Sequence, residues 1–232
     1  MTQKKLSIII PCHNEANNLP LLISDLKTFP GPCEICVVDS NSTDLSFLTI
    51  VLSGSKYINT KEGNRGIQLS KGAEKTSGDW LLFIHADSRL PEDWSKHVLK
   101  LINSEATKNT IWYFKFKVLR KGILFSFLQM SVNIRCLFLN TPYGDQGILV
   151  HKDAYKFLNG FNNLPIMEDI DFIERAKNNN YKIKSIGGSI YINTRRWHKK
   201  NILKKAIENA ILRRLWKSGK NPKELYNRYY KN

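Results

Sequence analysis

Short apolar runs that alternate with helical patterns constrain the fold of this chain most strongly. Leu6–Ile10 is an apolar run rich in isoleucine with one serine in it, and Trp80–Ile84 is a second apolar run. Such runs are typical of parallel strands that are buried on both faces. Between them, 17–28 and 64–76 have apolar residues at helical spacing, and 34–38 is a third short run. This order predicts an α/β fold with an open, mostly parallel, twisted sheet flanked by helices.

The second half of the chain is less regular. Ile111–Val118 alternates apolar and polar residues and predicts a strand, and Ile123–Leu139 follows as a predicted helix. Because that helix contains Gln129, Asn133 and Arg135, its uncharged part falls short of the ~20 apolar residues that a membrane-spanning helix needs. We therefore interpret it as a buried or interfacial helix. Further elements are expected at 147–150 (strand), 169–178 (helix), and 183–186 and 189–192 (two short strands).

Length and charge indicate the domain organisation. A chain of 232 residues suits one compact domain, which we place at 1–200, followed by a tail at 201–232. The chain has 36 Lys and Arg against 20 Asp and Glu, and 195–232 holds 13 of the basic residues but only 2 acidic ones. The tail predicts a basic amphipathic helix, which packs on the body, contacts anionic lipid or binds nucleic acid. Its apolar face consists of Leu203, Ile207, Ala210, Ile211, Leu215 and Trp216.

Cysteine usage and the amino-terminal residues indicate the compartment. Four cysteines are too few for a disulfide scaffold, and the pair Cys33 and Cys36 has no second ligand pair at zinc-site spacing. We expect buried, reduced cysteines and hence a reducing compartment. The apolar run 6–10 is too short for an export signal. The sequence therefore predicts a cytoplasmic protein, either free or peripheral on the inner face of the membrane.

Polar residues follow several of the predicted strands. Pro11, His13 and Glu15 come after the first strand, Asp39 after the second, and His85-Ala86-Asp87 after the run 80–84. Ligands of open α/β sheets bind beyond the carboxyl ends of the strands, so these residues predict a polar pocket on one rim. The loop after the first strand lacks a glycine-rich phosphate pattern, which counts against dinucleotide binding and against a nucleotidyltransferase. Nucleic-acid binding rests on the basic tail alone, without a recognised reading motif.

Four short motifs stand in order along the chain. They are Ser7–Glu15, which reads Ser-Ile-Ile-Ile-Pro-Cys-His-Asn-Glu, then 37–44, then 80–87, which ends in His-Ala-Asp, and Met167–Asp171. Together they resemble the opening, the second-strand motif, the metal-binding DxD and the catalytic ED motif of family-2 glycosyltransferases. The order and spacing agree over about 6–200. Residues 64–68, 143–147 and 195–197 resemble a small, mostly bacterial branch of that family.

The resemblance implies a fold and a donor. The fold would be GT-A, as in other nucleotide-diphospho-sugar transferases, with a nucleotide-binding half at 1–110 and an acceptor half at 111–200. The donor would be a nucleotide-diphosphate sugar, with a preference for UDP. Pro11, His13 and Glu15 would line the nucleoside pocket, Asp39 would accept a hydrogen bond from the base, Arg65 would reach the diphosphate, and His85, Ala86 and Asp87 would complete the donor site.

The resemblance also implies a divalent metal, Mg or Mn, that bridges the diphosphate. Asp87 would bind it, with His198 as a further ligand. The sequence departs from the family pattern here, because His85 stands where the first acid of DxD is usual. The resemblance alone therefore leaves the metal affinity of this motif open.

Catalysis would depend on Asp169. As a general base it would take the proton of the acceptor hydroxyl while that oxygen attacks the anomeric carbon, and a direct displacement inverts this carbon. Glu168 would hold the acceptor or act as an acid in the first turn of a helix. Asp145, Gln146 and Trp197 would border the acceptor, a sugar or a lipid-linked molecule. The resemblance thus implies a metal-dependent inverting glycosyltransferase.

Overall fold

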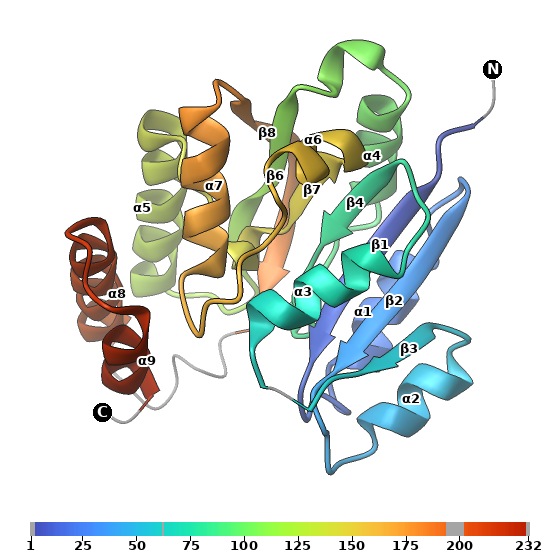
Figure 1. Ribbon diagram of the computed structural model, residues 1–232, viewed down its shortest axis with the longest axis horizontal. Helices are drawn as coiled ribbons and strands as arrows, with labels where there is room; N and C mark the ends of the chain where they lie inside the picture. Colours follow the sequence, from blue (N-terminus) through green and yellow to red (C-terminus); the bar gives the residue numbers. More distant parts are fainter. Residues whose placement is uncertain (1–2, 62, 194–201, 231–232) are drawn as a thin grey trace.

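A single mixed sheet forms the centre of the computed structural model, which describes residues 3–61, 63–193 and 202–230 (Figure 1). Its first half is parallel. β1 (Leu6–Cys12) pairs with β2 (Cys33–Asp39) on one side and with β4 (Trp80–Phe83) on the other, and β2 pairs with β3 (Lys56–Asn59).

The second half of the sheet runs in both directions. β7 (Ile148–His151) is antiparallel to β4 and to β6 (Thr110–Val118), and β6 is parallel to β8 (Lys182–Ile192). The short strand β5 (Ser88–Arg89) pairs antiparallel with β8. The strand order is β3-β2-β1-β4-β7-β6-β8-β5, so the expectation of a mostly parallel sheet is confirmed.

Helices cover both faces of the sheet (Figure 1). One face packs against α1 (Leu19–Leu26) and α4 (Trp94–Ile102), and the opposite face packs against α3 (Arg65–Glu74), α6 (Lys152–Phe157) and α7 (Glu168–Asn178). The remaining helices of the body are α2 (Ser46–Leu52), α5 (Ile123–Leu139) and the short helices η1 (Glu105–Thr107) and η2 (Gly144–Gln146). No helix within the described ranges is long and apolar enough to cross a membrane.

Burial on both faces explains the composition of the central strand β1. Ile8 and Ile10 belong to the core on the α1 side, and Ile9 belongs to the core on the α3 side. Because successive side chains of a strand point to opposite faces, a strand covered on both faces is mostly apolar, and the buried Ser7 hydroxyl donates a hydrogen bond to Glu34 Oε1 at 2.8 Å. α3 comes close to this strand at Gly72, where an added Cβ would lie 2.4 Å from Ile9 Cγ2.

Two expected strands, 183–186 and 189–192, form the single strand β8. The register between β6 and β8 shifts between Tyr113 and Lys115, and the strand continues beyond the shift. Gly187 lies at this irregularity with φ of 96°, a left-handed conformation that favours glycine. A β-bulge therefore replaces the break that the two glycines indicated.

The carboxyl-terminal segment forms two helices rather than one. α8 (Ile202–Lys217) and α9 (Pro222–Tyr230) each contribute one buried leucine, Leu212 and Leu225, both 2% exposed. These leucines pack in a small cluster with the apolar residues of 166–170. Of the alternatives for the tail, packing on the body is therefore present in the structure.

The packed face of α8 differs from the predicted one. Ile207 and Ile211 were placed on it, but both are exposed, whereas Leu215 and Trp216 contact the cluster around Leu212. The side chain of Leu203 lies outside the described residues. The predicted apolar face is therefore correct at Leu215 and Trp216 and wrong at Ile207 and Ile211. The reason is that α8 has apolar residues on more than one side.

Candidate active site

The loops after β1 and β2 are bound together at the carboxyl edge of the sheet. Asn14 has φ of 54° and donates its backbone N–H to Ser42 Oγ at 2.8 Å, while its side-chain oxygen accepts the N–H of Thr43 at 2.8 Å. The Glu15 N–H donates to Ser46 Oγ at 2.9 Å. These bonds hold the polar residues after β1 in place beside the end of β2.

A pocket, which we name the rim pocket, opens where the ends of β1 and β4 meet α3. The amide of Gln68 donates to the carbonyls of Cys12 and Val38, at 2.9 and 2.7 Å, and thereby ties α3 to the ends of β1 and β2. All the predicted donor residues except Asp39 line this pocket. Its lining consists of Pro11, Cys12, His13, Glu15, Arg65, Gln68, His85, Ala86 and Asp87.

Asp39 lies beside the rim pocket and is 2% exposed. Its Oδ2 accepts the backbone N–H of Ser42 at 3.0 Å, and its Oδ1 accepts the Ser42 hydroxyl. The carboxylate thus shapes the loop after β2, as aspartates in such turns commonly do. Its hydrogen bond to a nucleotide base stays a prediction.

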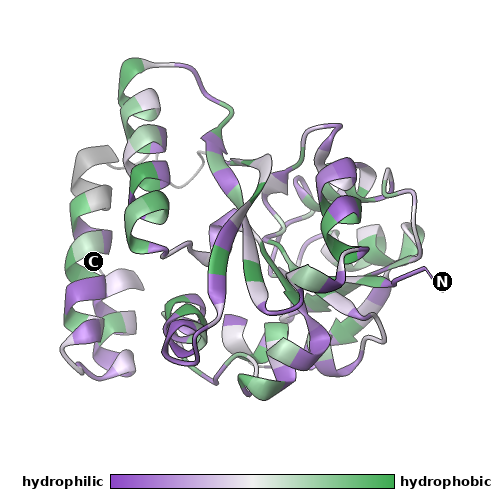
Figure 2. Cartoon of the chain, turned by 90° about the horizontal axis from the view of Figure 1, so that it is seen from above, coloured by the Kyte–Doolittle hydropathy of each residue, from purple (hydrophilic) through white to green (hydrophobic). Residues whose placement is uncertain are grey.

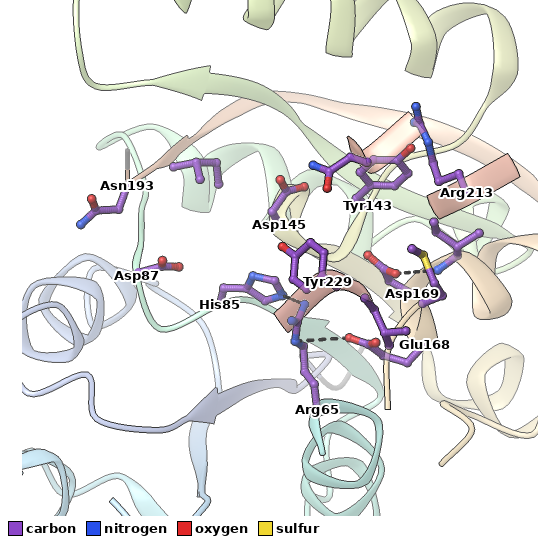
Figure 3. A pocket seen from close by; sticks show the side chains of 15 residues that line it. Arg65, His85, Asp87, Tyr143, Asp145, Glu168, Asp169, Asn193, Arg213 and Tyr229 are labelled. Atoms are coloured by element: carbon purple, nitrogen blue, oxygen red, sulfur yellow. Dashed lines mark hydrogen bonds and ion pairs between the residues drawn. The ribbon is translucent and has the colours of Figure 1, made fainter. Parts of the chain in front are cut away.

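A second pocket adjoins the first and shares Arg65, His85 and Asp87 with it (Figure 3). We name it the carboxylate pocket, because Asp145 and the neighbours Glu168 and Asp169 also line it. Three residues predicted for catalysis and for the acceptor side are therefore brought together. The rest of the lining is Tyr143, Ile166, Met167, Ile170, Ile192, Asn193, Asn209, Arg213 and Tyr229.

Arg65 connects the two pockets. Its Nε lies 3.3 Å from Glu168 Oε1, and its Nη1 lies 3.5 Å from His85 Nε2 (Figure 3). Burial raises the pKa of the Glu168 carboxyl, which the Arg65 charge opposes, and Glu168 in turn raises the pKa of Arg65. The guanidinium is thus held charged at the junction, where its remaining donors suit an anionic ligand.

Asp169 lies in the first turn of α7 and faces the carboxylate pocket (Figure 3). Its Oδ2 accepts the backbone N–H of Gly144 at 2.6 Å, and its Oδ1 accepts the N–H of Ile170 at 2.8 Å. These bonds orient the carboxylate, and each oxygen keeps a lone pair for a further partner. A Cβ on Gly144 would lie 3.2 Å from Asp169 Oδ2 and 3.2 Å from His85 Nε2, so glycine permits this approach.

The Asp145 carboxylate is buried but incompletely hydrogen-bonded within the described residues. Its Oδ1 is buried and has no hydrogen-bond partner among the described residues. Burial raises the pKa of Asp145 to about 6, with Arg135 opposing the shift and Asp169 adding to it. Because buried polar atoms are nearly always hydrogen-bonded, this oxygen is suited to accept a hydrogen bond from a ligand hydroxyl.

Gln146 does not line the carboxylate pocket but lies behind its wall, and its contact with an acceptor stays a prediction. The side chain is fully buried, and its amide donates to the Phe114 carbonyl at 3.2 Å. Its Oε1 accepts the backbone N–H of Tyr143 and an N–H of Arg135, both at 3.2 Å. Gln146 therefore braces the turn that carries Asp145.

Two arginines that were not predicted for the site surround the Tyr143 ring. The Arg135 guanidinium lies 3.6 Å from the centre of the Tyr143 ring, and that of Arg213 lies 5.0 Å from it. Burial and the neighbouring Arg135 lower the pKa of Arg213, and no carboxylate in the described part of the chain pairs with it. Residues so far apart along the chain give no local pattern that could have revealed this cluster.

The predicted ligands and acceptor contacts are only partly described. Trp197 and His198 lie outside the described residues, and among those described no group of three or more His, Cys, Asp and Glu side chains could hold a metal ion. Asp87 nevertheless fits one, since Mg²⁺ usually binds through one or two carboxylates together with substrate phosphates and water. Asp87 lines both pockets, where a diphosphate would complete such a site.

The sequence profile of the family described as Glycosyl transferase family 2 matches residues 7–140, more than half of the chain. The chain belongs to this family. An uncharacterized glycosyltransferase from Haemophilus influenzae is 26% identical over an alignment 179 residues long, which covers 72% of this family-2 chain and 60% of that relative.

Solved structures agree with the fold of this family-2 chain. S. aureus TarS in complex with UDP-GlcNAc has a TM-score of 0.66 and 19% identity, over 82% of this chain and 59% of that one. Glucosyl-3-phosphoglycerate synthase from Mycobacterium tuberculosis, with Mn²⁺, UDP-Glc and phosphoglyceric acid, has a TM-score of 0.57 and 17% identity, over 82% and 69%. These likenesses establish the GT-A fold. The chain spans about 60% of the length of the H. influenzae relative and of the TarS chain 1–349 in that complex.

Proposed function

We propose that this family-2 chain transfers a sugar from a nucleotide-diphosphate sugar, with UDP favoured, to an acceptor hydroxyl with inversion of the anomeric carbon. The observation that carries the proposal is the junction of the two pockets. Arg65, His85 and Asp87 belong to both pockets, and Asp169 faces the carboxylate pocket (Figure 3). A donor in the rim pocket would place its sugar at the junction, within reach of an acceptor in the carboxylate pocket.

The rim pocket suits a nucleoside diphosphate. Arg65 offers guanidinium donors at the junction, and the carboxyl ends of β1 and β4 are where an open sheet binds its ligand. TarS was solved with UDP-GlcNAc and the M. tuberculosis synthase with UDP-Glc, which supports uridine as the nucleoside.

A divalent metal, Mg or Mn, is part of the proposal. Asp87 would hold it, with His198 as the predicted second ligand. When bound, the cation supplies positive charge that stabilises the leaving nucleoside diphosphate. The M. tuberculosis synthase structure contains Mn²⁺, which supports this choice of cofactor.

Asp169 is the proposed general base. It accepts the proton of the acceptor hydroxyl as the acceptor oxygen bonds to the anomeric carbon, and the bond from that carbon to the diphosphate oxygen breaks on the opposite side. The nucleoside diphosphate leaves with the bonding electrons. The backbone bonds from Gly144 and Ile170 orient the carboxylate for this step.

The acceptor side has aromatic and cationic groups. Tyr143 and Tyr229 line the carboxylate pocket and can contact a sugar ring or an apolar chain, and Trp197 stays a prediction for the same role. Arg213 has no carboxylate partner among the described residues, so it suits an acceptor that carries an anionic group. A sugar or a lipid-linked molecule is the proposed acceptor, and peripheral attachment to an anionic membrane belongs to the same proposal.

Thermal unfolding with nucleoside diphosphates, with and without Mn²⁺ or Mg²⁺, tests the donor and the metal. Ligands that bind the native state raise the unfolding midpoint, so we expect UDP to raise it and Asp87→Ala to remove the metal-dependent part. A chain that no nucleotide stabilises would contradict the proposal.

The Asp169→Asn variant tests the base. We expect it to keep the UDP-induced shift and to lose about 100- to 10,000-fold in UDP release from UDP-sugar with a membrane lipid extract as acceptor. Full activity of this variant would exclude Asp169 as the base.

A further inference from the structure

Helix α5 exposes an apolar face. Eight of its side chains are each between 47% and 89% exposed, and they recur at helical spacing along the whole helix. They are Ile123, Leu124, Phe127, Met130, Ile134, Leu137, Phe138 and Leu139. Scattered exposed apolar residues are normal, but a contiguous apolar face of this size marks a site of contact with another apolar surface.

Two amide side chains of α5, those of Gln129 and Asn133, face the protein. Asn133 accepts the backbone N–H of Phe116 and donates to the carbonyl of the same residue, both at 3.0 Å, and Gln129 accepts the N–H of Val118 at 3.0 Å. β6 pairs with β7 only as far as Tyr113, so these amides complete the hydrogen bonds along the free part of its edge. α5 therefore turns these two amides toward the sheet beside its buried residues Leu128 and Cys136, and it exposes an apolar face to solvent.

The charges that lie close to α5 along the chain have one sign. Residues 106–144 contain six Lys or Arg and no Asp or Glu. Arg120 and Lys121 precede the helix and are exposed, and the Lys177 ammonium donates to the carbonyl of Leu139 at its end. Arg135, the charged residue of the helix itself, is turned inward to Gln146 and Tyr143. The exposed face is thus uncharged and has cations at both ends.

We propose that the exposed face of α5 lies in the headgroup region of an anionic membrane, with the helix axis parallel to the surface. A helix of 17 residues, about 25 Å long, is too short to span a bilayer but suits this orientation. Cations at its ends would contact lipid phosphates. Figure 2 shows α5 coloured mostly hydrophobic at the end of the molecule, next to α8. This inference rests on the membrane attachment proposed above and names the surface that makes it.

The exposed face of α2 provides a matched control. It also carries large exposed apolar residues, among them Leu48, Val51 and Leu52, but it lies at the opposite end of the sheet beside β3 (Figure 1). The test compares the triple variant Phe127→Ser, Ile134→Ser, Phe138→Ser with Leu48→Ser, Val51→Ser, Leu52→Ser. All six residues are exposed, so neither variant disturbs the core.

Sedimentation with vesicles of phosphatidylcholine alone, or mixed with phosphatidylglycerol, measures the binding. We expect the parent chain to prefer the anionic vesicles, the α5 variant to lose at least about tenfold in partitioning, and the α2 variant to bind like the parent. Unchanged binding of the α5 variant, or loss in the α2 variant instead, would overturn the proposal. Light scattering supplies a further test. If the parent chain were a dimer that the α5 variant splits into monomers, with vesicle binding unchanged, the α5 face would join two copies and the proposal would be overturned.

The UDP-induced shift of the unfolding midpoint is measured on the same three proteins. We expect it to be equal in all of them, because α5 contributes no residue to the rim pocket. Vesicle binding through α5 without any UDP-induced shift would count against the proposed transferase but not against the proposed membrane surface. A UDP-induced shift without vesicle binding would count against the membrane surface but not against the transferase.

Discussion

Gly144 lies where a β-carbon would touch the candidate base. A Cβ there would be 3.2 Å from both Asp169 Oδ2 and His85 Nε2, tighter than most contacts in proteins. We expect Gly144→Ala to displace the Asp169 carboxylate and to lower the rate of transfer by about 10- to 100-fold. The UDP-release assay measures the effect, with Gly188→Ala as the control, whose nearest contact would be 3.4 Å. Equal rates for the two variants would show that the approach of Gly144 to Asp169 is unimportant.

The protonation of Asp145 makes the stability of the fold depend on pH. Its pKa of about 6 lies above the value of about 4 for an unfolded chain, so the native state binds more protons than the unfolded state between these values. The charged form therefore destabilises the ligand-free fold above about pH 6, and this cost disappears as the pH falls toward 4. We expect Asp145→Asn to raise the free energy of unfolding more at about pH 8 than at about pH 4.5. Denaturant unfolding at both values checks this, and an equal change at both would contradict the raised pKa.

At the scale of elements, the amides of α5 replace a missing strand. Asn133→Leu would leave the N–H and carbonyl of Phe116 without their partner, and we expect a loss of about 2–4 kcal/mol in the free energy of unfolding. Ile134→Ser, one residue further on and exposed, should change it by less than about 0.5 kcal/mol. Denaturant titration separates the two. A cost that is larger at 134 than at 133 would mean that α5 packs by its other face.

The sequence predicted those elements whose burial requires a recognisable pattern of apolar residues. The runs at 6–10 and 80–84 are buried on both faces, so every residue in them except Ser7 is apolar. The single strand β8 was not predicted, because its bulge at Gly187 depends on its register with β6 and not on its own residues. α4 was also missed, although Trp94, Val98 and Ile102 are buried at helical spacing, so the signal was present in the sequence.

The residues of the candidate site also fall into those that the sequence predicted and those that it did not. Residues directly after a strand, such as His13 and Asp87, could be predicted, since the end of a strand fixes where they lie. The places of Gln146, Arg213 and Tyr229 depend on packing between distant elements, so the sequence did not reveal them.

At the scale of the whole molecule, the two halves of the sheet supply different walls of the site. The parallel half ends in the rim pocket, whereas the carboxylate pocket also needs η2, α7 and the helices after the body (Figure 3). Arg213 and Tyr229 come from α8 and α9, which are held on the body by the cluster of Leu212 and Leu225 with 166–170. The carboxyl-terminal helices therefore form a wall of the carboxylate pocket, which is the proposed acceptor side.

This arrangement predicts that the docking of α8 and α9 is needed for transfer but not for donor binding. In the double variant Leu212→Ser, Leu225→Ser we expect faster proteolysis within 202–230, an unchanged UDP-induced shift of the midpoint, and at least about a tenfold loss in UDP release with acceptor present. Ile207→Ser, Ile211→Ser is the matched control, because both side chains are exposed on the same helix. If the double variant released the helices and still transferred at the parent rate, the acceptor would have to bind without Arg213 and Tyr229.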